Sequence, residues 1–148
     1  MDNPAGIDVP NEVYQRWNPF PGEKTPLYVE GIHDDYEGFR ILLCGEEKSS
    51  PMLRLLFDSS HLFYRVVRES CWLNADIPKS LINDIGRGHR FFTVSDSRLL
   101  RWLIDVSSGT YDSPTIRHYF LCMANEVIDV VACDAPKADN LNDLDSSM

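Results

Sequence analysis

The chain has 148 residues, a formal net charge of −9 and a pI of about 4.7, and 43% of its residues are hydrophobic. This length fits a single domain with its own core, and the hydrophobic content argues against disorder of the whole chain. The negative charge disfavours direct binding to phosphate backbones or anionic membrane surfaces, whereas it suits solubility and a basic protein partner.

Residues 1–26 contain five prolines, which interrupt any long helix or central strand in this segment. Large apolar residues recur there at nearly helical spacing, at Val13, Tyr14, Trp17 and Phe20. A solvated leader rarely contains Trp and Phe. The pattern therefore predicts one short helical turn over Asn11–Trp17, with its aromatic rings packed on a sheet.

Four strand-like runs follow, separated by polar turns at 33–38 and 45–51. The runs are Leu27–Ile32, Phe39–Cys44, Met52–Asp58 and Leu62–Cys71. Apolar residues alternate along them and no helical segment intervenes, so the pattern predicts an antiparallel meander. We expect this meander to be the scaffold of the fold.

The segment after the meander is less regular. Pro78 permits a helix to start, so the sequence predicts a short helix over Lys79–Ile85 that Gly86-Arg87-Gly88 ends. A short strand, Phe91–Val94, comes next. The two glycines lack the lysine and the strand-loop-helix context of a phosphate-binding loop, so we do not interpret them as one.

The clearest helix signal begins at Ser95, a candidate N-cap whose hydroxyl can accept a free backbone N–H. A broad apolar stripe follows, and Gly109 is well placed to end the helix. The stripe consists of Leu99, Leu100, Leu103, Ile104 and Val106. We predict that this helix covers one face of the sheet.

A final hairpin is predicted from strands Thr115–Met123 and Val127–Cys133, and residues 137–148 have the composition of an acidic flexible tail. The whole pattern predicts an α+β fold. We expect one predominantly antiparallel, curved sheet of about six or seven strands, with one main helix on one face. Residues 1–136 would form a single domain, with 1–26 packed on it.

Four cysteines occur, at Cys44, Cys71, Cys122 and Cys133, and none belongs to a C-x-x-C pair. Each lies in or at the end of an apolar run, so we interpret them as buried free thiols rather than zinc ligands. The first residues lack the basic and apolar regions of a signal peptide, and no run of about 18 apolar residues could span a bilayer. We therefore expect a cytoplasmic protein without a metal ion or cofactor.

His33, Asp34 and Asp35 form the first cluster with possible chemistry. They could bind a metal ion, or act as a base with its orienting carboxylate. Alternatively they form a hydrophilic turn, since adjacent side chains of an extended chain point in opposite directions. His61 and His89 lie in predicted loops without an identifiable partner.

His118 lies in the middle of its strand, and Asp129 lies in the partner strand, near enough for the two side chains to meet. A carboxylate beside an imidazole is half of a catalytic triad, but no Ser or Cys has the setting of a nucleophile. Cys122 and Cys133 lie in apolar strands, where thiols are poorly reactive. A structural cross-strand pair is the competing interpretation.

The remaining surface signal is a mixture of carboxylates and tyrosines in turns. Aromatic side chains anchor interfaces and charge steers encounter, so this mixture favours a patch that binds a basic partner. Solvated turns are the alternative interpretation. The candidate partner-binding residues are Asp34, Asp35, Tyr36, Glu37, Glu46, Glu47, Tyr111 and Asp112.

Segments of the last third of the chain resemble a group of small bacterial proteins. They are Trp102 with Gly109-Thr110-Tyr111, then 116–119, then 125–131 with Pro136. In size, acidity and α+β pattern the chain is similar to immunity proteins encoded beside polymorphic toxins. The resemblance implies a non-enzymatic inhibitor that binds a cognate toxin or effector and blocks its active site.

The residues leave two alternative functions open. One is a small enzyme that uses His118 and Asp129, or a metal ion at His33, Asp34 and Asp35. The other is a subunit that assembles with copies of itself through an exposed sheet edge.

Overall fold

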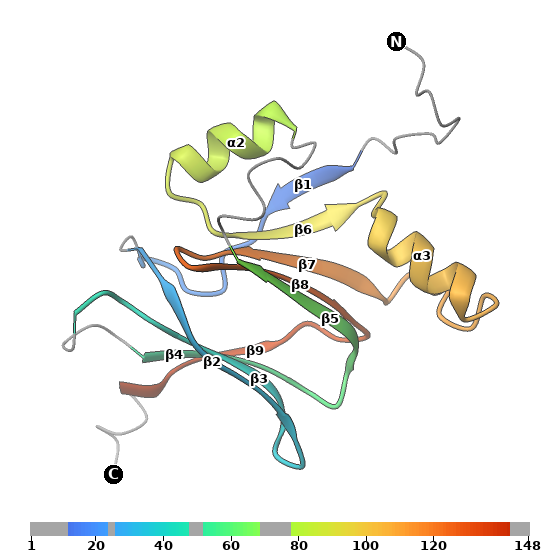
Figure 1. Cartoon of the computed structure of the whole chain (residues 1–148), viewed down its shortest axis with the longest axis horizontal. Coiled ribbons are helices and arrows are strands. Elements are labelled where there is room, and N and C mark those ends of the chain that lie inside the picture. Colours follow the sequence, from blue (N-terminus) through green and yellow to red (C-terminus); the bar gives the residue numbers. More distant parts are fainter. Residues whose placement is uncertain (1–11, 24–25, 48–51, 69–77, 143–148) are drawn as a thin grey trace.

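The computed structural model describes residues 12–23, 26–47, 52–68 and 78–142. Within these ranges the chain forms nine strands and two α-helices (Figure 1). In chain order they are β1 Val13–Arg16, β2 Tyr28–Asp35, β3 Gly38–Cys44, β4 Met52–Asp58, β5 His61–Arg68, α2 Lys79–Gly86, β6 Phe91–Ser95, α3 Arg98–Val106, β7 Arg117–Cys122, β8 Glu126–Ala132 and β9 Lys137–Asn140. Neither helix is long and apolar enough to cross a membrane.

The strands form two sheets in which every neighbouring pair is antiparallel. The first sheet has the order β1-β6-β7-β8-β5, and the second has the order β2-β3-β4-β9. The sheets lie one over the other, and α2 and α3 lie on the side of the five-stranded sheet that faces away from the second sheet (Figure 1). The described fold therefore has three layers.

The largest core lies between the two sheets. It forms because buried and partly exposed residues alternate strictly along most of β3 and β4. Every second residue of these strands is buried, and these buried positions, which lie on one face, all hold large apolar side chains. They are Phe39, Ile41, Leu43, Leu53, Leu55 and Phe57. They pack against inward-facing residues of β7 and β8, including Tyr119, Leu121, Ile128 and Val130.

Strands β7 and β8 are buried on both faces. Their outward-facing side chains meet two smaller clusters, one around Leu81 of α2 and one around Leu99 and Leu103 of α3. A strand covered on both faces needs apolar residues at successive positions. The continuous run Val127–Ala132, interrupted only by Asp129, meets this requirement.

The α+β class and the antiparallel pairing are confirmed, but the expected single curved sheet is divided into two. The meander ends after β4, because Asp58 adopts a left-handed backbone conformation with φ of 58° and β5 then pairs with β8. In the described ranges two helices, rather than one main helix, cover the five-stranded sheet. The predicted end of the fourth run at Cys71 lies outside the described residues.

The expected flexible tail does not begin at residue 137. Residues Lys137–Asn140 form β9, which pairs with the free edge of β4. The Arg54 guanidinium binds the Asp139 carboxylate at 2.8 Å, and Ala138 packs on the main core. Backbone pairing and this ion pair order a segment whose composition alone suggested mobility.

Two local predictions are wrong. Residues Val13–Arg16 form a strand instead of the helical turn over Asn11–Trp17, because their backbone pairs with β6 from Val13↔Ser95 onwards. The aromatic packing is nevertheless as expected, since Trp17 lies 5.0 Å from Tyr119 between ring centroids. The N-cap of α3 is Ser97, whose Oγ accepts the Leu100 N–H at 3.0 Å, because Ser95 is still part of β6.

Replacing Leu55 by Ala should destabilise the protein by about 2–5 kcal/mol, because it leaves a cavity in a close-packed core. Urea unfolding measures this free energy. Val106→Ala on α3 is the control, because Val106 is 58% exposed, and its effect should stay within about 0.5 kcal/mol. Equal effects of the two substitutions would contradict the assigned core.

Candidate functional sites

A buried polar network crosses the outer face of the five-stranded sheet. The His118 Nε2 atom lies 2.6 Å from Asp129 Oδ1, and the His118 Nδ1 atom lies 2.7 Å from Ser97 Oγ. Arg65 Nε donates to Asp129 Oδ2 at 2.8 Å. The predicted meeting of His118 and Asp129 is confirmed, and the structure adds Ser97 and Arg65 to it.

Only one proton arrangement satisfies every contact of the network when His118 is neutral. His118 Nε2–H donates to Asp129, so His118 Nδ1 carries a lone pair and accepts the Ser97 hydroxyl proton. Ser97 Oγ in turn accepts the Leu100 N–H. The network thus links the start of α3 to three strands through consecutive hydrogen bonds.

Ser97, His118 and Asp129 are the residue types of a hydrolytic triad, but their arrangement differs from a working one. Their exposed fractions are 5%, 2% and 4%, so Ser97 Oγ has no open approach for a substrate. The serine oxygen is also occupied as the cap of α3. The geometry favours the structural cross-strand pair over catalysis.

Burial raises the pKa of the Asp129 carboxyl, but the hydrogen bond and charge of His118, with those of Arg65, outweigh it. The net effect lowers the pKa below its ordinary value. The ionised carboxylate is therefore the form that the fold stabilises.

The predicted partner-binding residues near the first turn lie on the β2–β3 hairpin, which we call the acidic hairpin (residues 34–37). Asp35 pairs with Gly38, so the turn contains only Tyr36 and Glu37. Gly38 has φ of +100°, and a Cβ there would come within 2.9 Å of Asp58 Oδ1. Glycine is required at this position for both reasons.

The carboxylates of the acidic hairpin already have partners within the protein. Arg40 binds Asp35 at 2.7 Å and Glu37 at 3.4 Å, and His61 Nε2 lies 3.1 Å from Asp34 Oδ2. The hydrogen bond from Arg40 holds the pKa of Asp35 below its ordinary value. Tyr36, between these carboxylates, is 95% exposed.

The other predicted partner-binding residues lie elsewhere. Glu46 and Glu47 follow the opposite end of β3, and a seven-residue strand spans about 23 Å. Tyr111 and Asp112 follow α3, which packs on the five-stranded sheet, whereas the acidic hairpin belongs to the second sheet. Figure 1 shows α3 and the β2–β3 hairpin apart from each other. The eight residues therefore do not form one patch.

The proposed metal cluster is not assembled. His33, Asp34 and Asp35 belong to β2 rather than to its turn, and the two carboxylates bind His61 and Arg40 on different sides. In the described part of the chain, no group of three or more His, Cys, Asp or Glu residues could hold a metal ion.

Three of the four cysteines lie among the described residues. Cys122 is buried, whereas Cys44 and Cys133 are half-buried. Burial and a contact with Glu30 raise the pKa of the Cys44 thiol. Cys71 lies outside the described residues.

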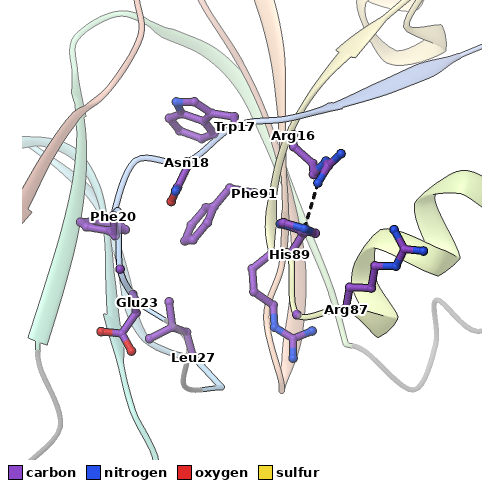
Figure 2. Close-up of a pocket in the computed structure, with 12 residues that line it drawn as sticks. Arg16, Trp17, Asn18, Phe20, Glu23, Leu27, Arg87, His89 and Phe91 are labelled. Carbon is purple, nitrogen blue, oxygen red and sulfur yellow. Dashed lines mark hydrogen bonds between the residues drawn. The ribbon is translucent and has the colours of Figure 1, made fainter.

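A cavity of about 620 Å³ opens between the segment after β1 and the segment before β6 (Figure 2). We call it the arginine pocket. Its charged and aromatic lining consists of Arg16, Trp17, Phe20, Glu23, Arg87, His89, Arg90 and Phe91. Arg16 Nη1 lies 3.2 Å from His89 Nε2, so that nitrogen accepts the hydrogen bond.

Sequence reasoning did not find the arginine pocket, because its two sides are about 70 residues apart and meet only through the pairing of β1 with β6. One signal was present. Residues Arg87-Gly88-His89-Arg90 form a basic run in a chain whose net charge is −9. The missed Ser97 had no such signal beyond its place before α3.

Comparison with known proteins finds no family model, no curated protein and no solved structure that matches this chain. The assignment of function therefore rests on the sites themselves.

Asp129→Asn should lower the stability at pH 7 by about 1–3 kcal/mol, because an amide has a single acceptor oxygen and cannot accept from both His118 and Arg65. The folded-state pKa of Asp129 lies below the unfolded one, so its contribution is present above pH of about 4 and is lost as pH falls further. Urea unfolding between pH 7 and pH 3 should show that the unfolding free energies of the variant and the wild type become more similar as pH falls.

Asp112→Asn is the control for this experiment, because Asp112 is an exposed carboxylate after α3. The unfolding free energy of this variant should stay close to that of the wild type at every pH. If the difference in unfolding free energy between Asp129→Asn and wild type instead grew as pH fell, the assigned direction of the pKa shift would be contradicted.

Proposed function

We propose that this protein is a non-enzymatic binding protein of the immunity type, which neutralises a cognate toxin or effector domain by direct contact through the acidic hairpin. The observation that carries the proposal is Tyr36, which is 95% exposed at the end of a hairpin. Large exposed aromatic side chains at a protruding turn are typical interface anchors.

Pre-organisation supports this role for the acidic hairpin. Arg40 binds carboxylates on both sides of Tyr36, and the two-residue turn fixes the direction in which the ring projects. A rigid anchor loses little conformational entropy when it binds. The hairpin therefore presents a preformed contact rather than a loop that must order.

Electrostatics supports a basic partner. The chain carries a net charge of −9, and this field attracts cationic surfaces over several ångströms before contact. Three carboxylates gather around Tyr36, and a cationic side chain of a partner could replace Arg40 or His61 as their counter-ion.

Tyr36→Ala should weaken binding to the partner at least about tenfold, mainly through faster dissociation, because it removes the anchor of the contact. The partner to test is the toxin or effector domain encoded next to this gene. Surface plasmon resonance measures the rates, and growth of cells that express both proteins measures neutralisation.

A charge-matched pair of variants tests which acidic turn contacts the partner. Asp34→Lys with Asp35→Lys should slow association more at low salt than Glu46→Lys with Glu47→Lys, which makes the same charge change at the other end of β3. Full neutralisation by Tyr36→Ala, together with equal association rates for the two double variants, would overturn the proposal. A neighbourhood without any toxin-like gene would argue against the immunity class.

A further inference from the structure

The arginine pocket concentrates positive charge on an otherwise acidic protein. Its twelve lining residues include three arginines, Arg16, Arg87 and Arg90, and a single carboxylate, Glu23. The whole chain has only 14 Lys and Arg among 148 residues. Cationic residues are therefore more than twice as frequent around this cavity as in the chain as a whole.

Two of the three arginines have no acidic partner in the described part of the chain. Among the described residues, no carboxylate lies within 4.0 Å of the guanidinium of Arg87 or of Arg90. Arg16 lies 3.8 Å from Asp84 and donates to His89. By contrast, Arg40, Arg54 and Arg65 each bind a carboxylate at 2.8 Å or closer.

Aromatic side chains, among them Trp17 and Phe91, also line the cavity. Trp17 is half-buried and packs edge-on against Phe91, with ring centroids 5.9 Å apart and planes at 84°. Figure 2 shows both rings on the side of the cavity opposite Arg87. Aromatic rings bind flat ligands by stacking, and guanidinium groups bind phosphate or carboxylate by paired hydrogen bonds.

Backbone amides do not provide a competing anion site here. The N–H groups of Arg87, Gly88 and His89 are all bonded to carbonyls of the last turn of α2. The cavity thus borders the C-terminal end of that helix, where the dipole attracts cations. On this side of the pocket, recognition of an anion would therefore come from side chains, of which Arg87 and Arg90 are cationic.

We propose that the arginine pocket binds a small organic anion that carries a flat ring, the class to which nucleoside monophosphates belong. The anionic group would bind Arg87 and Arg90, and the ring would lie on the Trp17 side. A cavity of about 620 Å³ is in the range of small-molecule sites, which is roughly 300–1,000 Å³.

This ligand would not compete with a partner on the acidic hairpin. Leu27 lines the pocket just before β2 starts, whereas Tyr36 follows the other end of that strand. Eight residues of extended strand separate the two sites by about 26 Å. The proposal is therefore independent of the proposed function and is tested separately.

Isothermal titration calorimetry of the full chain with the four common ribonucleoside 5′-monophosphates tests the proposal. At least one should bind with a Kd below about 1 mM, which corresponds to roughly −4 kcal/mol. The matching nucleoside and inorganic phosphate should each bind at least about tenfold more weakly, and added salt should weaken binding of the nucleotide.

Arg87→Ala with Arg90→Ala should reduce this affinity at least about tenfold. Arg101→Ala with Arg117→Ala removes the same charge from exposed positions on α3 and β7, so it should bind like wild type. Circular dichroism and thermal melting verify that both variants fold.

Three results would overturn the proposal. They are the absence of binding by all four monophosphates below 1 mM, equal binding of phosphate and nucleotide, and equal losses in the two double variants. The first result would contradict the proposed class of ligand. The second would contradict a contact between the ring and the aromatic side chains, and the third would contradict the role assigned to Arg87 and Arg90.

Discussion

The β7–β8 hairpin is the constraint on which the rest of the structure depends. It pairs with β6 on one side and with β5 on the other, so it forms the centre of the five-stranded sheet. Its inner face meets the second sheet, and its outer face meets both helices. Every layer of the described fold is therefore built against these two strands.

The one polar interruption of that hairpin has a specific role. His118 and Asp129 place a charged hydrogen bond on a face that is otherwise apolar, at a cost in desolvation. A one-residue slip of β8 would move Asp129 to the face between the two sheets, without His118 or Arg65. The network thus selects one register and fixes the start of α3 through Ser97.

Local sequence patterns predicted a strand or helix well where the spacing of its apolar residues alone determines its structure. Alternation along Met52–Asp58 defined β4 to the residue, and the apolar stripe after Ser95 located α3 within two residues. The division into two sheets was not predictable in this way, because the partner of β5 lies about 65 residues away in β8. Strand β1 was missed for the same reason, since pairing with β6 overrides its helical spacing.

The candidate sites also differ in whether local sequence patterns could predict them. The acidic hairpin and the pair of His118 with Asp129 were visible in the sequence, because a turn or two neighbouring strands bring their residues together. The arginine pocket was not, because it exists only where the segment after β1 lies beside the segment before β6. Sequence patterns locate sites within a local motif and miss sites between distant segments.

The pairing of β9 with β4 has a consequence for synthesis of the protein. Asp139 binds Arg54 across 85 positions of the chain, so the edge of β4 stays open until almost all the other strands have left the ribosome. An open edge of alternating apolar sequence is a site for intermolecular pairing. During synthesis the β4 edge is therefore open to pairing with other chains, and β9 is the strand that closes it.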